Sequence, residues 1–586
     1  MKNLWVYLKE YTKESILAPL FKLLEVVFDL MVPLVVARMI NIGVAGNNRG
    51  YIWGCFAVLV LMAALGLASS FTAQFFAAKA SVGFAAKLRQ ALFDKIQSFS
   101  FTELDTIGSD TLITRITNDV NQVQNGVNMG LRLLLRSPFV VFGAMIMAFM
   151  IDVHCAVVYA VAIPVLFAVV FAIMLVSIPM FKKVQAGLDR VTGMTRENLT
   201  GVRVIRAFCR EEQSVREFDL SNRELTRLNE FVGRVSALLN PATYVLINLA
   251  AVFVIDRAAV RVELGGLAQG DVVALYNYML QIIVELIKLA SLIITLNKAL
   301  ACAGRVSGVL AVEPGMTYPA ESAGLPTAAE SGEAVRFDNV SFTYKNAGAP
   351  SLTDISFSAK RGETVGVIGG TGAGKSTLVN LVPRFYDANE GEVSLFGRPA
   401  ESYTRAELCA AVGVVPQRAV LFEGSIADNL RWGNETASDA ELWDALTAAQ
   451  AKEVVEGKPG GLDFELEQNG RNLSGGQRQR LSIARALVKK PEVLILDDSS
   501  SALDYATDAA LRKAIHSLSG SMTTFIVSQR IACIRHADKI LVLDNGALVG
   551  TGTHDELMAS CPVYSEIYYS QFPEERNDGM KGGERA

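Results

Sequence analysis

The stretch from Gly369 to Thr377 has the residue types and spacing of a loop that cradles phosphate groups. Its glycines at 369, 372 and 374 allow the backbone to curl, so that successive N–H groups point inward at a polyphosphate. Lys375 can then reach the β- and γ-phosphates, and the hydroxyl of Ser376 can ligate Mg²⁺. The residues expected to form this ATP and Mg²⁺ site are Gly369, Gly370, Thr371, Gly372, Ala373, Gly374, Lys375, Ser376 and Thr377.

A phosphate loop requires a particular local structure, and the flanking sequence supplies it. The apolar run 364–368 predicts a buried strand that leads into the loop, and residues 378–381 predict the start of a helix that leaves it. The N-terminus of that helix would add the positive end of its dipole to the phosphate site. The context therefore favours nucleotide binding over a chance match to the pattern.

Two further stretches carry related chemistry. The apolar strand expected over 493–496 ends in Asp497 and Asp498, and a carboxylate at such a strand end can hold Mg²⁺, a role that we assign to Asp497. Between the two phosphate-proximal motifs, a Leu-Ser-Gly-Gly-Gln run precedes an expected helix over 478–487, which predicts a second anion-binding helix terminus. The residues expected to bind nucleotide there are Ser474, Gly475, Gly476 and Gln477.

The composition indicates a membrane protein, because 51% of the 586 residues are apolar and only 19% are charged. The apolar residues form long runs in the first ~300 positions, and about six of these runs could cross ~30 Å of hydrocarbon as helices. The predicted crossings are 16–42, 51–76, 133–151, 155–180, 242–262 and 272–296. The net charge of −4, without a long basic block, argues against nucleic acid as a partner, and the scattered cysteines and histidines predict neither a disulfide framework nor a zinc site.

The connecting segments predict the orientation. Segments 41–50, 152–154 and 263–271 together hold a single Lys or Arg, whereas 79–132 and 181–238 are long and rich in both. The positive-inside rule therefore places the long segments and both termini in the cytoplasm, for a multi-pass protein of the cell membrane. The long segments read as helices that project beyond the bilayer, turn and return, either as levers that touch another domain or as solvated connections without a mechanical role.

The chain therefore divides into regions of different fold class. We expect an all-α six-helix transmembrane domain over 1–306 and a linker over 307–333. An α/β P-loop domain should follow over 334–573, with antiparallel strands near 335–342 and 352–357 beside a parallel core sheet, and a disordered tail over 574–586.

In order and spacing, the phosphate loop, the run from Leu473 to Gln477 and Asp497 resemble the nucleotide-binding domain of ABC transporters. With the six-helix N-terminal half, the chain resembles a half-transporter of the exporter type. In that family two nucleotide domains face each other head to tail, and each ATP lies between the phosphate loop of one chain and the signature run of the other. The resemblance covers nearly the whole sequence.

This resemblance implies roles for further residues. Tyr344 would stack on the adenine, and Gln417 would reach Mg²⁺ and the attacking water. The run 501–504 would communicate with the opposite site, and the stretches 98–110 and 197–208 would be coupling elements.

Two departures from the family pattern concern hydrolysis. The family places a glutamate after the Mg²⁺ aspartate and a histidine at the γ-phosphate, whereas this chain has Asp498 and Gln529. A carboxylate one methylene shorter lies ~1 Å or more from the water, which can cost ~10²-fold in rate. Gln529 can donate a hydrogen bond but cannot carry a positive charge. A third departure, Glu467-Gln468-Asn469-Gly470, replaces an acidic loop residue that many exporters use toward the partner's coupling helix.

Because the signature is intact while the chain's own hydrolytic residues are altered, the sequence resembles the degenerate-site subunit of bacterial heterodimeric multidrug-type exporters. The expected partner is a second half-transporter that brings the missing glutamate and histidine, and a homodimer with slow turnover remains the alternative. The expected cargo is an amphipathic or hydrophobic solute, such as a drug, lipid or peptide. Import by the same fold, or an ATP-binding regulator or gated pore without turnover, are the competing functions.

Charged residues within the expected crossings have two readings. Lys22, Glu25 and Asp29 share one helix face, and Glu285 and Lys288 are three residues apart. They could contact a polar substrate, or Lys22 could pair with Glu25 and Glu285 with Lys288 inside the bundle. The roles of Asp256, Arg257 and Arg261 in the fifth crossing stay open in the same way.

Overall fold

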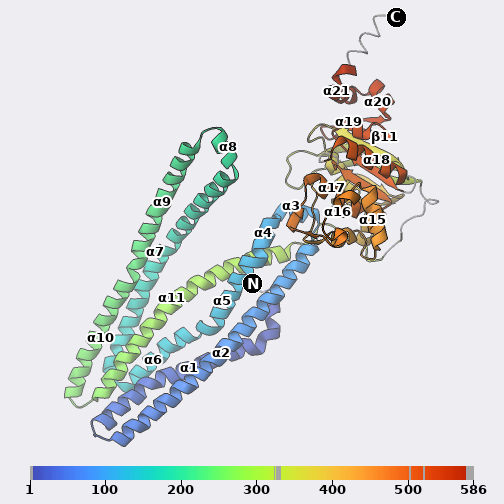
Figure 1. The fold of residues 1–586 in the computed structure, drawn as a ribbon. Coiled ribbons are helices and arrows are strands. Elements are labelled where there is room, and N and C mark those ends of the chain that lie inside the picture. Colours follow the sequence, from blue (N-terminus) through green and yellow to red (C-terminus); the bar gives the residue numbers. More distant parts are fainter. Residues whose placement is uncertain (1–3, 322–323, 325–331, 500–502, 519–521, 576–586) are drawn as a thin grey trace, which may run out of the picture. The chain divides into compact units, whose positions relative to one another are not determined.

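The computed structural model describes residues 4–321, 324, 332–499, 503–518 and 522–575, which form two compact units (Figure 1). The first unit holds the chain up to Gln97 and from Asp110 to Val312, and the second holds Ser98–Ser109 together with the chain from Glu313 onward. The predicted fold class, a helical N-terminal region followed by an α/β C-terminal domain, is confirmed.

The first unit is helical throughout. It comprises η1 (Trp5–Tyr11), α1 (Thr12–Arg38), η2 (Met39–Val44), α2 (Arg49–Gln97), α4 (Ser109–Thr114), η3 (Arg115–Asp119), α5 (Val120–Leu133), α6 (Arg136–Ile151), α7 (Val153–Thr200), α8 (Val202–Ala207), α9 (Glu211–Ala237), α10 (Leu239–Glu263) and α11 (Gln269–Ala311). Among the described residues, five helical segments are long and apolar enough to cross a membrane, and they are Arg49–Gln97, Ser109–Ile151, Val153–Thr200, Glu211–Glu263 and Gln269–Ala311.

The first predicted crossing corresponds to helix α1, which is long enough to span but is not one of those five. The charged residues Lys22, Glu25 and Asp29 lie inside it. Two prolines, Pro19 and Pro33, also lie within the helix. Helix α1 packs against α2, α6 and α11, so Lys22 and Glu25 are buried, whereas the side chain of Asp29 stays about half exposed.

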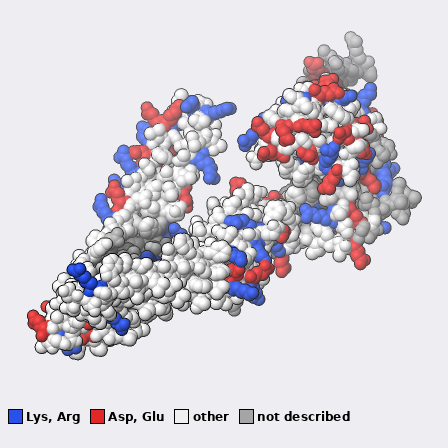
Figure 2. All heavy atoms as spheres, turned by 60° about the horizontal axis from the view of Figure 1, so that its bottom comes forward, with Lys and Arg blue, Asp and Glu red and all other residues white. Residues whose placement is uncertain are grey.

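Several helices continue well past the predicted crossings. Helix α7 has 48 residues, which corresponds to about 72 Å at ~1.5 Å per residue, more than twice the ~30 Å of a hydrocarbon core. It lies beside α9, and the short helix α8 joins them at the far end of the pair (Figure 1). Helix α11 runs to Ala311, so its last residues lie within the range predicted as linker. Figure 2 shows few charged side chains along the middle of the first unit, as expected of a surface that faces lipid.

The second unit contains two main sheets. Strands β2 (Leu352–Lys360), β1 (Glu333–Phe342), β4 (Glu390–Leu395) and β5 (Arg398–Pro399) form one antiparallel sheet in this order, which confirms the predicted antiparallel pair. The other sheet has the order β12 (Ala547–Gly552), β11 (Lys539–Asp544), β3 (Thr364–Gly369), β10 (Thr523–Val527), β9 (Val493–Asp497) and β6 (Val412–Val415), with only β12 antiparallel.

Helices surround these sheets. They are α12 (Lys375–Leu381), α13 (Arg405–Ala411), α14 (Ile426–Arg431), α15 (Asp439–Ala448), α16 (Lys452–Glu456), α17 (Gly475–Val488), α18 (Tyr505–Leu518), α19 (Ile531–Ile534), α20 (His554–Ser560) and α21 (Pro562–Gln571). Strands β7 (Gly424–Ser425) and β8 (Glu465–Leu466) pair antiparallel as a separate two-stranded sheet. The parallel strands β3 and β9 are almost wholly buried, and the loops that carry the predicted chemistry leave their carboxyl ends.

The Ser98–Ser109 segment belongs to the second unit and forms helix α3 (Phe101–Ile107). The Phe101 ring stacks on Phe385 with a centroid separation of 4.4 Å, and the Tyr386 hydroxyl donates to Asp105 Oδ2 at 2.6 Å. Glu103 caps the helix through Ser100 and accepts a hydrogen bond from the Gly315 amide at 3.2 Å. The first of the two predicted coupling elements is therefore packed on the nucleotide domain.

Candidate functional site

The phosphate loop connects the buried strand β3 to helix α12. Gly374 has φ +92° at the helix N-cap, and a Cβ there would lie 2.6 Å from the Ser351 carbonyl oxygen. Gly372 also has a left-handed backbone, with φ +82°. Both conformations favour glycine, which explains two of the three glycines that the sequence pattern singled out.

The two polar side chains at the start of α12 point in different directions. Lys375 Nζ donates to the carbonyl oxygens of Gly369 at 3.0 Å and Gly370 at 2.6 Å, so the ammonium lies over the loop. Burial lowers the pKa of Lys375, while Asp498 and Asp497 act in the opposite direction. The Ser376 hydroxyl donates to Asp497 Oδ1 at 3.0 Å.

The Ser376–Asp497 pair unites two residues predicted to hold the metal from stretches 121 positions apart. Asp497 is 8% exposed, and its burial raises the pKa of the carboxyl, with the hydrogen bond from Ser376 partly offsetting that shift. A hydroxyl and a buried carboxylate are hard oxygen ligands of the kind that Mg²⁺ prefers. These residues fit Mg²⁺ bound together with nucleotide phosphates, where the metal would neutralise phosphate charge.

Asp498 and Gln417 meet in the same cleft. Gln417 follows β6, and its Nε2 donates to Asp498 Oδ2 at 3.2 Å. Asp498 has φ +45°, and its amide donates to the Val527 carbonyl at 3.0 Å, which ties it to the end of β10. The carboxylate is thereby directed into the cleft by its two neighbouring strands.

The cleft has a volume of about 250 Å³. Its lining joins the phosphate loop to the predicted hydrolytic residues, and comprises Ser351, Thr371, Gly372, Ala373, Gly374, Lys375, Ser376, Thr377, Gln417, Asp497, Asp498, Val527, Ser528 and Gln529. The tertiary structure thus gathers the residues that the sequence assigned to metal binding and hydrolysis.

Gln529 is fixed by a residue that the sequence analysis missed. Gln571, the last residue of α21, donates through Nε2 to the Gln529 carbonyl at 2.7 Å and accepts from the Ile531 amide at 2.9 Å. The C-terminal helix therefore holds the backbone of the loop that carries Gln529. A lone glutamine 42 positions downstream gives no sequence signal for such a contact.

Tyr344 follows β1 and lies partly buried beside the phosphate loop. Its hydroxyl lies 3.2 Å from Thr377 Oγ1, and its ring makes edge contacts with Phe342 and Tyr386 at centroid separations of 4.8 and 5.3 Å. These contacts fix the ring at the margin of the loop, where an aromatic face can meet a planar base.

The signature run lies apart from this cleft. Ser474 is the N-cap of α17, where its hydroxyl accepts from the Gln477 amide at 3.3 Å and Gln477 Oε1 accepts from the Ser474 amide at 3.1 Å. Ser474, Gly475, Gly476 and Gln477 are all described, and none of them lines the phosphate cleft. The structure therefore does not bring the two predicted nucleotide-binding elements together within one chain.

The structure describes only some of the other predicted residues. Ser501 and Ala502 of the run 501–504 lie outside the described residues. Asp504 caps α18, since its Oδ1 accepts from the Thr507 amide at 2.9 Å. In the Glu467–Gly470 departure, Asn469 has φ +61° within the short helical turn η6 (Gln468–Gly470), a conformation that asparagine tolerates.

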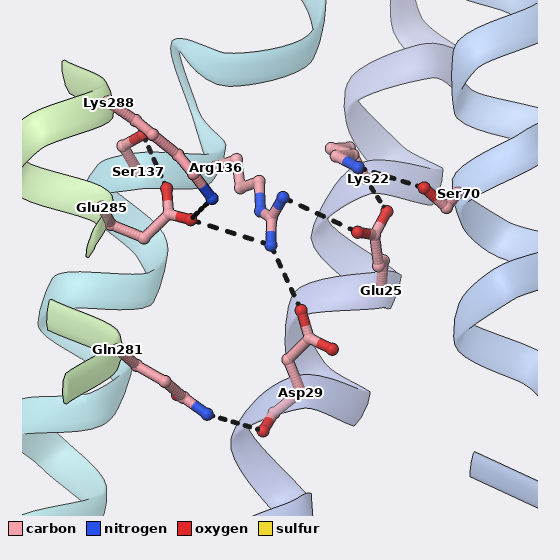
Figure 3. Close-up of polar contacts among 9 residues, drawn as sticks. All are labelled: Lys22, Glu25, Asp29, Ser70, Arg136, Ser137, Gln281, Glu285 and Lys288. Atoms are coloured by element: carbon pink, nitrogen blue, oxygen red, sulfur yellow. Dashed lines mark hydrogen bonds and ion pairs between the residues drawn. The ribbon is translucent and has the colours of Figure 1, made fainter. Parts of the chain in front are cut away.

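A second polar cluster lies among the helices of the first unit (Figure 3). Both predicted pairs are confirmed, with Lys22 Nζ 2.6 Å from Glu25 Oε2 and Lys288 Nζ 2.9 Å from Glu285 Oε1. Arg136, which the sequence analysis did not single out, lies between them. Its guanidinium is 3.2 Å from Asp29 Oδ2, 3.7 Å from Glu25 and 3.8 Å from Glu285.

The remaining charged residues of the fifth crossing lie elsewhere. Arg261 pairs with Asp152 at 2.9 Å, which joins the end of α10 to the start of α7. Asp256 and Arg257 are exposed on α10. The exposed positions of Asp256 and Arg257 therefore give no support to a role in the cluster around Arg136.

Comparison with known proteins identifies related chains over the full length. Residues 15–286 match the family described as ABC transporter transmembrane region, and residues 352–501 match the family described as ABC transporter. The uncharacterized ABC transporter ATP-binding protein YfiB of Bacillus subtilis (strain 168) is 36% identical over 578 residues, covering 99% of this chain and 100% of the relative.

Two further comparisons extend this result. The ATP-dependent lipid A-core flippase of Cupriavidus metallidurans is 30% identical over 577 residues, covering 98% of this chain and 96% of the flippase. A solved structure of a bacterial Atm1-family ABC exporter with ATP bound has the same fold, with a TM-score of 0.78 at 23% identity, and covers 96% of this chain and 98% of that chain.

Proposed function

The chain belongs to the ABC transporter family, with its membrane region and its ATP-binding domain in one polypeptide, and from this premise we propose that it is the degenerate-site half of a heterodimeric exporter. Its family membership implies ATP and Mg²⁺ as ligands of the nucleotide domain and transport driven by ATP. The proposal concerns the partner, the division of hydrolysis between the two sites, and the cargo.

The observation that carries the proposal is the contrast between the two nucleotide-binding elements. In the phosphate cleft, Asp498 and Gln529 stand where the family has a glutamate and a histidine, which favours nucleotide binding with slow hydrolysis. The signature run is intact and does not line that cleft. It can therefore complete the nucleotide site of another chain. A partner with a competent phosphate site would then hydrolyse ATP against this signature.

The exposed end of the α7–α9 pair is an argument for a partner chain. Around α8, the side chains of Leu199, Val204 and Phe208 are 71%, 60% and 73% exposed. Apolar side chains gathered at the tip of a projecting helical pair are costly in water, and they suit a docking contact with a second subunit. We assign this tip the role of second coupling element.

For the cargo, we propose an amphipathic or hydrophobic solute, namely a drug, a lipid or a peptide. Similarity over nearly the full length to a lipid A-core flippase favours a lipid-like solute within this range. The orientation that accompanies this proposal has both termini and the projecting helices in the cytoplasm, in the cell membrane. Nothing in the charge or motifs of the chain favours a nucleic acid as a partner.

The decisive experiment compares this chain alone with the pair that it forms. We expect the purified full-length chain to bind a fluorescent ATP analogue but to release phosphate slowly. Co-expression with a half-transporter that has the glutamate and histidine, such as one encoded beside this chain, should raise phosphate release about 10- to 100-fold.

Two variants in the pair assign the active site. A Cβ at Gly475 meets no atom within 4 Å, so Gly475→Glu should leave this chain folded while it places a carboxylate against the partner's ATP. We expect Gly475→Glu to abolish phosphate release by the pair, whereas Lys375→Ala should reduce it far less. Rapid hydrolysis by this chain alone, lost on Asp498→Asn, would instead establish a homodimer with Asp498 as its base.

Two alternatives are separated by other readouts. Uptake in inverted and in right-side-out vesicles distinguishes export from import by the same fold. A regulator or gated pore would bind nucleotide saturably in complex with its partner but would show no stimulated phosphate release.

A further inference from the structure

The cluster around Arg136 contains equal numbers of positive and negative side chains. The cations are Lys22, Arg136 and Lys288, and the carboxylates are those of Glu25, Asp29 and Glu285. Its inner members are well satisfied, since Glu285 is 4% exposed and accepts from Lys288 at 2.9 Å and from Ser137 Oγ at 3.0 Å. Most of the network is therefore structural, in agreement with the interpretation in which these residues pair inside the bundle.

Two members differ from the others because they remain accessible. The side chain of Asp29 is 47% exposed and that of Lys288 is 43% exposed, while the side chain of Arg136 between them is 16% exposed. Arg136 contacts one oxygen of Asp29, and Figure 3 shows the second oxygen directed away from the guanidinium. The network thus presents one negative and one positive group with capacity for a further partner.

Both groups open onto the same cavity. It has a volume of about 540 Å³, within the ~300–1,000 Å³ typical of ligand sites. Besides Asp29, Arg136, Lys288 and Glu285, its wall is largely apolar, with Val32, Val36, Leu280 and Val284 contributed by α1 and α11. A cavity with charged groups at one side and aliphatic side chains at the other suits an amphiphile.

The depth of the cluster is consistent with that ligand. From Arg136 to the end of α6 at Ile151 is about 22 Å, and from the start of α11 at Gln269 to Glu285 is about 24 Å, at ~1.5 Å per residue. The Asp152–Arg261 ion pair lies at the end of the bundle that holds Ile151 and Gln269, which is the end away from the cluster. In the orientation proposed above, the cluster therefore lies in the cytoplasmic third of a ~30 Å hydrocarbon core, where a headgroup of the inner leaflet could enter.

We propose that this cavity binds a zwitterionic amphiphile, with its ammonium at Asp29, its anionic group at Lys288 and Arg136, and its apolar part against the valines and Leu280. A purely anionic ligand would be attracted by Lys288 but repelled by Asp29 and Glu285. A purely cationic ligand would be attracted by Asp29 but repelled by Lys288 and Arg136. A zwitterion adds no net charge and pairs both exposed groups, whereas an uncharged ligand would pair neither, and in a low-dielectric interior an uncompensated charge is costly. This inference rests on the proposed function, whose cargo it narrows.

The test is equilibrium binding to the full-length chain in an uncharged maltoside detergent, which requires neither ATP nor a partner. The zwitterionic probes are lysophosphatidylethanolamine, from the lipid class, and ciprofloxacin, from the drug class. The single-charge probes are dodecyl phosphate and dodecylamine. At least one zwitterion should bind about tenfold more tightly than either single-charge amphiphile. Which zwitterion binds distinguishes a lipid source from a drug-like one.

Two variants test the assignment of the charges. Asp29→Asn should weaken binding of the tighter zwitterion about tenfold without weakening dodecyl phosphate, and Lys288→Gln should weaken both. The matched controls are Asp256→Asn on α10 and Lys298→Gln on α11, which remove the same charges at exposed positions outside the cavity. Both controls should bind the zwitterion within about twofold of the unaltered chain.

Binding of dodecyl phosphate or dodecylamine as tightly as the zwitterions would overturn the proposal, and that comparison needs no variant. Unchanged zwitterion binding in both Asp29→Asn and Lys288→Gln would also overturn it. The proposed heterodimer fails on different results, namely the phosphate-release measurements. ATP-driven transport without zwitterion binding would refute only the proposed zwitterionic ligand. Zwitterion binding without transport would refute only the proposed exporter function.

Discussion

The side-chain amide of Gln417 donates to Asp498 Oδ2 at 3.2 Å and so links the carboxyl ends of strands β6 and β9 across the phosphate cleft. Gln417 is exposed, so both residues remain within reach of a nucleotide and its attacking water. The family's glutamate would extend one methylene farther into this cleft. The contact thus defines the position from which a longer carboxylate would act.

The first prediction restores the altered hydrolytic residues. The double variant Asp498→Glu with Gln529→His should raise phosphate release at this chain's own site about 10- to 100-fold, because the carboxylate regains ~1 Å of reach and the ring can contact the γ-phosphate. The measurement is single-turnover hydrolysis in the pair with the partner's site inactivated. Asp498→Asn is the control and should stay at or below the starting rate. An unchanged rate in the double variant would show that these residues do not limit hydrolysis.

The second prediction concerns the buried carboxylate of Asp497. Its pKa in the folded chain is raised by burial, so between its unfolded and folded values the folded chain binds more protons. Stability therefore decreases as the pH rises through that window, and ionised Asp497 is a cost at neutral pH. Asp497→Asn should raise the melting temperature of the nucleotide domain by roughly 2–4 °C without ligand.

The same Asp497→Asn variant should lose most of the stabilisation that Mg²⁺ and ATP give, because the neutral amide is a poor ligand for a hard cation. Differential scanning fluorimetry with and without Mg²⁺ and ATP measures both effects. Asp544→Asn, on β11 away from the phosphate cleft, is the matched control and should change neither value. A lower melting temperature without ligand would contradict the assigned cost of burial.

The third prediction concerns helix α3. Phe101→Ala removes the ring that stacks on Phe385 at 4.4 Å, and Tyr386→Phe removes the hydroxyl that donates to Asp105 at 2.6 Å. We expect Phe101→Ala to lower transport about tenfold and Tyr386→Phe to lower it two- to fivefold, corresponding to about 1.4 and 0.5–1 kcal/mol of lost contact. ATP affinity should change by less than about twofold, since neither residue lines the phosphate cleft.

These variants are compared with Phe93→Ala, an exposed aromatic of α2 that is 53% accessible. Transport in vesicles and nucleotide binding by fluorescence are measured on the same preparations. Equal loss of ATP affinity and transport in Phe101→Ala would mean that α3 supports the nucleotide domain as a whole, and would argue against a role in coupling.

The fourth prediction concerns Arg136, which contacts three carboxylates. Arg136→Gln should destabilise the membrane domain by about 1–3 kcal/mol, because Asp29 loses its cation, whereas Glu25 and Glu285 keep Lys22 and Lys288. Adding Asp29→Asn should recover part of that loss, by about 1–2 kcal/mol, since one uncompensated charge is removed. Thermal unfolding in detergent measures the cycle. Additive losses in the double variant would show that the two residues are not coupled.

Local patterns were sufficient to predict the phosphate loop and the secondary structure around it. Gly372 and Gly374 adopt left-handed backbone conformations, and β3 and α12 flank the loop as the periodicity indicates. The pairs Lys22–Glu25 and Glu285–Lys288 were one of the two interpretations that the three-residue spacing on a helix allowed, and the structure contains both pairs.

Contacts between distant segments were not predictable in the same way. Arg136 is a single cation near the start of a crossing, and nothing in its neighbours shows that α1 and α11 supply three carboxylates to it. Gln571 gives no signal of its contact with the loop of Gln529. Helix α11 extends to Ala311 because its helical pattern continues past the apolar run that marked the crossing.

The sequence by itself determined that this protein has a membrane half and an ATP-binding half, and it predicted which residues belong to the phosphate loop and signature and which two residues weaken hydrolysis. These properties follow from residue type and short spacing, which fix local backbone conformation and chemistry. Only the tertiary structure decided that Ser376 meets Asp497, that Gln417 meets Asp498, and that Arg136 unites three carboxylates beside a cavity. Such contacts depend on how strands and helices far apart in the chain pack, and no local pattern encodes that packing.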